Sequence, residues 1–186
     1  MSGTSFDAPW MWGDLRFTRA VVRALEDDAC ARYLKDEEAC GYLVGPANDA
    51  LLCDELVPLP NLAARLHQLD PATFFRTART FFAFDEKKFN DAVHRGRASG
   101  RPVKVIYHSH LDVGAYFSAT DAAVMSGGDP PAEEGGSGRL GAGPPWPVSF
   151  LVTSVRAGVS GPVVDEHKLF VWKDRSFVEA PFVILG

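Results

Sequence analysis

The strongest constraint on the fold of this chain is a short strand that runs into two histidines. Residues 103–107 are mostly apolar and rich in β-branched side chains, which predicts a buried strand. His108 and His110 follow at once, and side chains two positions apart on a strand point to the same face. The sequence therefore predicts that both imidazoles are directed at one point.

A serine and an aspartate follow shortly afterwards. Residues 118–125 predict the start of a helix with Ser118 as a candidate N-cap, and Asp121, three residues later, shares its helix face. Two neutral imidazoles and one carboxylate form a three-ligand set for Zn²⁺ that leaves the fourth tetrahedral position to water, as in catalytic sites. Taken singly, each residue has a simpler interpretation. A histidine at a strand end can be a surface or hydrogen-bonded residue, and Ser118 can be a helix cap only.

A second segment makes the pattern more specific. Glu38 lies just before Gly41, where another strand is expected to start. Together with the spacing His-x-His-x7-Ser-x-x-Asp from His108 to Asp121, this segment resembles the JAMM zinc metalloproteases, also called MPN-plus or Mov34/PAD-1 proteins, of prokaryotic type. The resemblance covers nearly the whole chain. It implies an α+β fold, the cytidine-deaminase-like MPN domain, with a mixed central β-sheet flanked by helices.

The resemblance also implies roles for five residues. His108, His110 and Asp121 would hold the Zn²⁺, and Glu38 would be the general base that takes a proton from water and passes it to the leaving amine. Ser118 would donate a hydrogen bond to the developing oxyanion. Without the resemblance, Glu38 would be interpreted as a surface carboxylate beside two other acidic residues.

The family acts on the C-terminal tails of ubiquitin-like proteins, so the implied activity is that of a zinc peptidase or isopeptidase. The implied partner is a ubiquitin-like or sulfur-carrier protein, cut after its C-terminal Gly-Gly. Leu111 stands where the common family member has proline, while the ligand residues are intact. Two alternatives stay open. One is a zinc amidohydrolase that acts on a small-molecule amide, because the motif specifies metal and water rather than substrate. The other is a non-catalytic MPN scaffold, a class that has lost ligand residues.

Composition and charge exclude other functional classes. The chain has 186 residues, 46% of them hydrophobic, which predicts one domain, 1–186, with an N-terminal tail, 1–13, that carries two tryptophans of which at least one should pack. A net charge of -5 without a basic block argues against nucleic acid as a partner, and no apolar run is long enough for a membrane span. Three unevenly spaced cysteines and the lack of a signal peptide predict reduced thiols in a cytoplasmic protein. The oligomeric state is not indicated.

One stretch differs in composition from the rest. In the segment 127–147, seven of 21 residues are glycine and five are proline, which predicts a mobile loop inserted after the helix of Asp121. The remaining chain predicts alternating helices and strands. The expected elements are a helix over 18–35, a hairpin of 41–45 and 50–59, one or two strands within 74–84, a helix over 86–99 capped by Asp85, a strand over 148–155, a hairpin of 169–172 and 176–178, and an apolar C-terminal tail that docks on the domain.

Overall fold

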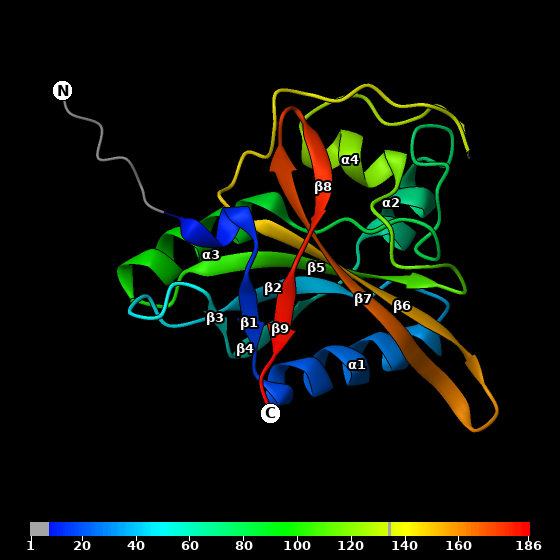
Figure 1. Ribbon diagram of the computed structural model, residues 1–186. Coiled ribbons are helices and arrows are strands. Elements are labelled where there is room, and N and C mark those ends of the chain that lie inside the picture. The colour runs from blue at the N-terminus through cyan, green and yellow to red at the C-terminus, as the bar shows by residue number, and fades with distance from the viewer. Residues whose placement is uncertain (1–7, 134) are drawn as a thin grey trace.

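The structure, a computed structural model, describes residues 8–133 and 135–186 and is built around a six-stranded sheet (Figure 1). The central strands β5 and β6 run parallel, and all other neighbours in this sheet are antiparallel. The sheet is therefore mixed, as expected. Its strands are, in spatial order, β4 (Glu55–Leu59), β2 (Cys40–Val44), β5 (Val103–Leu111), β6 (Ser149–Gly158), β7 (Gly161–Lys173) and β8 (Ser176–Ala180).

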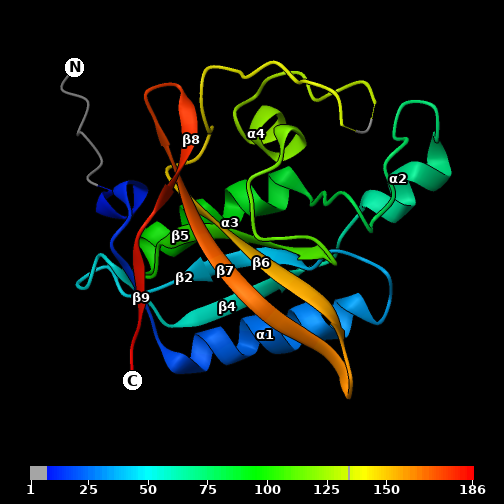
Figure 2. The same cartoon turned by 45° about the vertical axis from the view of Figure 1, so that its right-hand side comes forward.

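Helices cover both faces of this sheet (Figure 2). The helix α1 (Arg19–Tyr33) packs on one face, and α3 (Glu86–Ala98) and α4 (Ala119–Met125) lie on the other. Each face has its own apolar core, because alternate residues of β5 point to opposite sides. This arrangement confirms the α+β class. The remaining elements are the 3₁₀ helix η1 (Pro9–Trp12), the helix α2 (Ala63–Leu69), and a parallel three-stranded sheet of β3 (Leu52–Cys53), β1 (Leu15–Phe17) and β9 (Phe182–Ile184).

The strand β5 is longer than the sequence predicted, since it continues through both histidines to Leu111. All nine of its residues are buried, with β2 paired on one edge and β6 on the other. His108 consequently shares the side of Ile106, which belongs to the core under α3 and α4, whereas Tyr107 belongs to the core under α1. The two histidines thus face α4.

The three helices that the sequence predicted are confirmed as α1, α3 and α4. Thr18 accepts a hydrogen bond from the backbone of Val21 and caps α1, and Asp85 accepts one from Lys88 and caps α3. Ser118 caps α4 as expected. At the chain ends, Trp10 is buried while Trp12 is exposed, and the apolar C-terminal tail docks as β9 against β1. The expected tail residues 1–7 lie outside the described residues.

The strands expected within 74–84 were a wrong prediction. Residues 70–85 contain neither helix nor strand, and the short helix α2 before them was not foreseen. The phenylalanines made the segment appear strand-like. However, the carbonyl of Phe81 and the N–H of Ala83 bond to the side chain of Asn61, and the carbonyl of Ala83 accepts from the backbone of Leu62, so these groups do not pair with a strand. Packing of the aromatic rings, not strand pairing, determines the path of this segment.

The second strand of the expected hairpin, 50–59, is divided. Leu52 and Cys53 form β3 in the small sheet, and only the later part, β4, pairs with β2. The break is at Asp54, whose backbone N–H donates to Val44 and whose carboxylate pairs with Arg101. The final hairpin is confirmed, although its first strand, β7, already begins at Gly161 because it pairs along most of β6.

The glycine-rich segment 127–147 passes over α4 (Figures 1 and 2) and has one isolated β-bridge, between Asp129 and Arg139. Its glycines allow close backbone packing. A Cβ on Gly128 would lie 2.0 Å from the carbonyl oxygen of Arg139, and one on Gly141 would lie 2.1 Å from that of Ser126. The loop is thus anchored on the end of α4, and its mobility stays a prediction.

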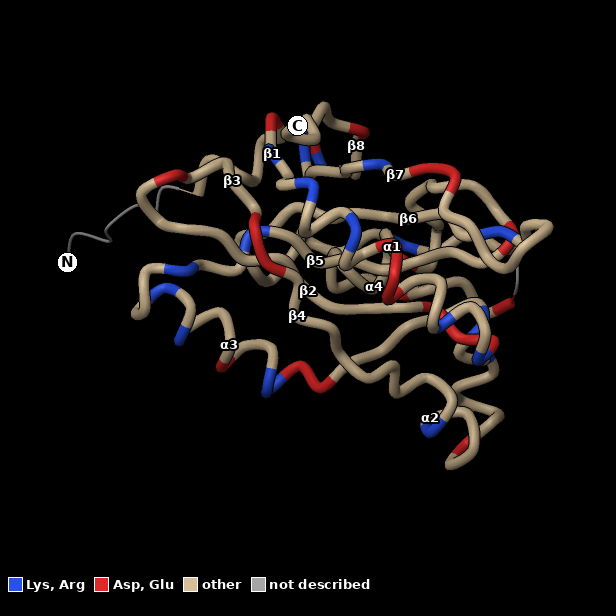
Figure 3. Tube along the Cα trace, turned by 90° about the horizontal axis from the view of Figure 1, so that it is seen from below, with Lys and Arg blue, Asp and Glu red and all other residues tan. Residues whose placement is uncertain are grey.

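The distribution of charged residues, the state of the cysteines and the hydropathy of the helices do not change this description of the fold. Basic and acidic residues are interspersed along the trace (Figure 3). All three cysteines are free thiols, as expected. No helix among the described residues is both long and apolar enough to cross a membrane.

Candidate metal centre

Three side chains meet where β5 passes the start of α4. The Nε2 atoms of His108 and His110 lie 3.2 Å apart, and Oδ2 of Asp121 lies 3.4 Å and 3.5 Å from them. Donor atoms around a tetrahedral zinc ion, with bonds of about 2.0–2.1 Å, are separated by about 3.3–3.4 Å. The three donors therefore have the spacing of a zinc site with one open position. Among the described residues, these three side chains form a group that could hold a metal ion.

The start of α4 fixes the direction of the carboxylate. Oγ of Ser118 accepts the backbone N–H of Asp121 at 3.1 Å, and Oδ2 of Asp121 accepts the backbone N–H of Ser118 at 3.0 Å. These two bonds form a reciprocal cap, which satisfies two N–H groups that a helix start leaves unpaired. The Ser118 hydroxyl also donates to the same Oδ2 at 2.6 Å. Two hydrogen bonds from Ser118 thus hold the oxygen that faces the histidines, and the third fixes the backbone of Asp121.

The ring of His110 is oriented through Nδ1, the nitrogen that does not face the other donors. Its Nδ1 lies 3.1 Å from the carbonyl oxygen of Gly114. Since a carbonyl only accepts, Nδ1 carries a proton, and Nε2 is the nitrogen that faces His108 and Asp121. The ring of Tyr116 stands edge-on to the same imidazole, with centroids 4.9 Å apart. The orientation of His110 is therefore fixed with Nε2 towards the other two donors.

The ionisation states of this group also suit a divalent cation. Burial lowers the pKa of His108 by more than the neighbouring Asp121 raises it. Burial acts to raise the pKa of Asp121, but the charge interactions and hydrogen bonds with His108 and His110 outweigh it and hold that pKa far below its usual range. The donor set is thus two imidazoles and one carboxylate anion. This is the combination of nitrogen and oxygen ligands that zinc binds.

Glu38 is buried at the entrance to β2 and is not the surface carboxylate that its acidic neighbours suggest. Burial, with a smaller contribution from the charge of Asp121, raises the pKa of Glu38 well above its usual value. Together with His110, Ser118 and Asp121 it lines a pocket of about 410 Å³. The structure thus brings the predicted site residues together, because His108, which does not line the pocket, lies beside His110 and Asp121.

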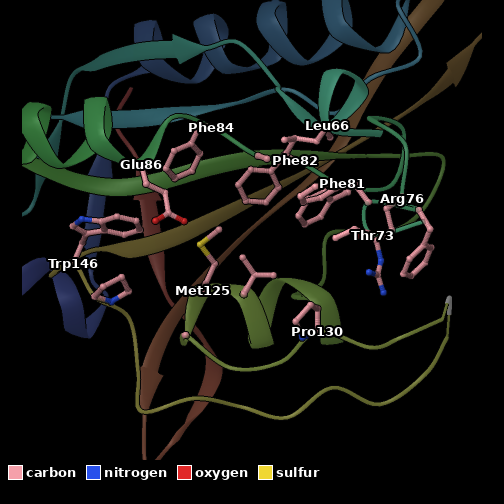
Figure 4. Close-up of a pocket in the computed structure, with 17 residues that line it drawn as sticks. Leu66, Thr73, Arg76, Phe81, Phe82, Phe84, Glu86, Met125, Pro130 and Trp146 are labelled. Atoms are coloured by element: carbon pink, nitrogen blue, oxygen red, sulfur yellow. The ribbon is translucent and has the colours of Figure 1, made fainter. Parts of the chain in front are cut away.

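A larger pocket of about 650 Å³ adjoins this site (Figure 4). Its lining is mostly apolar and includes Phe82, Met125 and Trp146. Phe82 separates it from the metal centre, because its ring stacks on that of His108 with centroids 4.4 Å apart. Arg76 lines both pockets, and its Nη2 donates to the carbonyl oxygen of Pro131 in the glycine-rich segment.

Several residues near the centre were not singled out from the sequence. Phe82 lies within the segment 74–84, for which strands were expected, and Asn61 follows the strand expected over 50–59. Arg79 lines the smaller pocket and pairs with Asp36 and Asp112. None of them carries a motif, so only the tertiary contacts reveal them.

The two aromatic residues before Ser118 point in different directions. Tyr116 lines the smaller pocket, whereas Phe117 packs against Phe150, Phe170 and Phe177. Cys40 is buried in β2 and packs in the core, and His94 is exposed on α3.

Comparison with known proteins yields one family. The model of the prokaryotic homologs of the JAB domain matches residues 18–161. No curated protein matches the chain.

Solved structures resemble the chain over most of its length. The protein DSY2949 from Desulfitobacterium hafniense has 22% sequence identity and a TM-score of 0.54, and covers 92% of this chain and 92% of its own. A protein from Salinibacter ruber has 20% identity and a TM-score of 0.50, with the same coverage of both chains. AF2198, a JAB1/MPN domain protein from Archaeoglobus fulgidus, has 14% identity and a TM-score of 0.48 over 92% of this chain and 98% of its own. At these identities, the first two support the fold alone.

We predict that each chain binds one zinc ion and that His110→Ala abolishes this binding, because it removes one of three donors. Elemental analysis of the purified protein, before and after reconstitution with zinc, measures the stoichiometry. His94→Ala, which removes an exposed imidazole on α3, is the matched control and should keep one zinc. A His110→Ala protein that still carries one zinc per chain would contradict the assignment.

Proposed function

The chain belongs to the prokaryotic JAB/MPN domain family, and from this membership we propose that it is a zinc-dependent peptidase or isopeptidase. Its substrate in this proposal is a ubiquitin-like or sulfur-carrier protein, cut after the C-terminal Gly-Gly. The observation that carries the proposal is the spacing of 3.2–3.5 Å between three buried donor atoms, on His108, His110 and Asp121. The intact donor set favours a hydrolase over a non-catalytic scaffold.

The chemistry that bound zinc supplies is a water molecule of lowered pKa at the open fourth position. Asp121, as a ligand, is not available as a base. Glu38 lines the same pocket, and burial raises its pKa well above the usual value of a carboxyl group. A carboxyl group beside the reacting water is the kind of side chain that takes up and returns a proton in general acid–base catalysis. We assign Glu38 the transfer of a proton from the attacking water to the leaving amine.

Ser118 has two possible contributions. Its backbone and hydroxyl cap α4 and hold Asp121, and a cap of this kind contributes about 1 kcal/mol to stability. Its side chain also lines the pocket, where a hydroxyl could donate to the developing oxyanion. Loss of such a donor typically costs about 2.7–4 kcal/mol of transition-state stabilisation. The proposal includes both contributions, since the hydroxyl proton can turn from Asp121 to a substrate oxygen.

A Gly-Gly tail suits this pocket for two physical reasons. Extended tails bind through their backbone groups, and glycine offers no side chain that interferes. Glycine also has no Cβ to crowd the water beside the attacked carbonyl. The walls of the pocket include Tyr116 from the loop after β5 and Gly135 and Gly136 from the segment that passes over α4. A tail without side chains next to the cleaved bond is the substrate that such a pocket admits most easily.

A small-molecule amide is the second candidate substrate. The volume of about 410 Å³ lies within the range of roughly 300–1,000 Å³ that is usual for small-ligand sites. The same zinc chemistry would hydrolyse such an amide. The two candidates differ in whether a protein tail is cut at all.

We expect the zinc-loaded protein to remove a short peptide extension placed after the Gly-Gly of a ubiquitin-like or sulfur-carrier protein. The rate should fall at least about tenfold when the second glycine becomes valine, because a Cβ then lies next to the attacked carbonyl. Intact-mass spectrometry of the two carriers at equal concentration measures both rates. Equal rates would refute backbone recognition, and no cleavage of any carrier would favour the small-molecule amide.

We further expect Glu38→Gln to lower turnover about 10²–10⁴-fold while zinc stays bound, because the amide has nearly the same size but cannot accept the proton. The rate and the zinc content are measured on the same preparation. Glu179→Gln makes the same change at an exposed position of β8 and serves as the control. A Glu38→Gln protein with near-normal turnover would remove Glu38 from the mechanism.

A further inference from the structure

The side-chain amide of Asn61, two residues after the end of β4, uses all of its hydrogen-bonding positions. Its Nδ2 donates to the carbonyl oxygens of Glu38 at 3.1 Å and Phe81 at 3.0 Å. Its Oδ1 accepts the backbone N–H groups of Ala63 at 2.9 Å and Ala83 at 3.2 Å. Carbonyls only accept and N–H groups only donate, so a single orientation of the amide satisfies all four partners. Asn61 thus joins three segments that are distant in sequence.

One of these segments carries Glu38. The backbone N–H of Glu38 donates to the carbonyl oxygen of Ala78 at 2.7 Å, and its carbonyl accepts from Asn61. The next residue, Ala39, is fixed as well, since Oγ of Ser109 accepts its N–H at 2.8 Å and the N–H of Ser109 donates to its carbonyl at 2.9 Å. Every backbone polar group of the two residues is therefore bonded. The amide of Asn61 is the one side-chain donor to the carbonyl of Glu38 among the described contacts.

A second segment carries Phe82. The two bonds from Asn61 reach Phe81 and Ala83, the residues on either side of it. The backbone N–H of Leu62 adds a third bond, to the carbonyl of Ala83 at 2.8 Å. The ring of Phe82, only 2% exposed, lies against the imidazole of His108 with centroids 4.4 Å apart and planes inclined by 20°. The direction in which His108 presents Nε2 thus depends on a ring whose backbone Asn61 holds on both sides.

We propose that Asn61 is a positioning residue of the metal centre. Its amide holds Glu38 beside the donor atoms and, through Phe82, restricts the rotation of the His108 ring. The part that concerns Glu38 rests on the proposed hydrolase function, whereas the part that concerns His108 requires only that the three donors bind a metal. When the groups that orient a ligand side chain are removed, the ligand must lose more conformational entropy on binding the metal. Mutation of such outer groups typically lowers metal affinity about 10–100-fold.

The test compares the zinc affinities of the purified protein and of Asn61→Asp, by competition with a chromophoric chelator. The aspartate has the same shape and still accepts from Ala63 and Ala83, but it cannot donate to Glu38 or Phe81. Asn90→Asp makes the same chemical change at an exposed position of α3 and is the matched control. We expect the affinity to fall at least about tenfold in Asn61→Asp and to stay unchanged in Asn90→Asp.

A second variant, Asn61→Ser, keeps the test decisive in case Asn61→Asp does not fold. In Asn61→Ser the hydroxyl can still accept from Ala63 two residues on but is too short to reach Phe81, and no charge is introduced. It should show the same direction of change. Far-ultraviolet circular dichroism of the zinc-free proteins identifies which variants are folded at the temperature of the titration.

The outcome separates positioning from a merely structural role. If Asn61 only stabilised the fold, the folded variants would unfold at lower temperature but bind zinc within twofold of the parent protein, and this result would overturn the proposal. Where the parent protein cleaves a Gly-Gly-extended carrier, we also expect Asn61→Asp to lower kcat with little change in KM. If the parent cleaves no carrier, the proposed function fails, and the zinc titration still decides the role of Asn61.

Discussion

The metal centre depends on one strand that is buried along its whole length and hydrogen-bonded on both edges. With β2 on one side and β6 on the other, β5 cannot slip or twist without breaking two ladders. His108 and His110 are therefore held on one face with their Nε2 atoms 3.2 Å apart. The helix α4 is set against that face and brings Asp121 to the same point. A capped helix start and a doubly paired strand are rigid supports, which a pre-formed metal site requires.

The two carboxyl groups of the site differ because their partners differ. Asp121 faces two imidazoles and the donors of a helix start, and its pKa lies far below the usual range. Glu38 is also buried, but burial and the charge of Asp121 raise its pKa. Opposite shifts in one pocket are typical of sites in which one carboxylate stays ionised and the other moves a proton. This division matches the proposed roles of Asp121 as a ligand and Glu38 as the base.

Four of the five predicted site residues carry local signals, whereas the fifth, Glu38, was predicted only through the family resemblance. His108, His110, Ser118 and Asp121 follow from strand alternation and helix capping, which act over a few residues. Asn61 and Phe82 could not be predicted, because their importance comes from hydrogen bonds and ring contacts between segments up to 26 residues apart, as in the stacking of Phe82 on His108. The same cause explains the wrong strand prediction for 74–84, where the apolar residues pack around a pocket instead of pairing in a sheet.

The central claim is that these two histidines and one aspartate bind zinc and leave one position open. X-ray absorption at the zinc edge of the reconstituted protein tests it most directly, since it reports the type, number and distance of the ligand atoms. The account predicts four nitrogen and oxygen ligands at about 2.0–2.1 Å, with the outer-shell signal of two imidazoles. Sulfur ligands at about 2.3 Å, or a spectrum without imidazole, would contradict it.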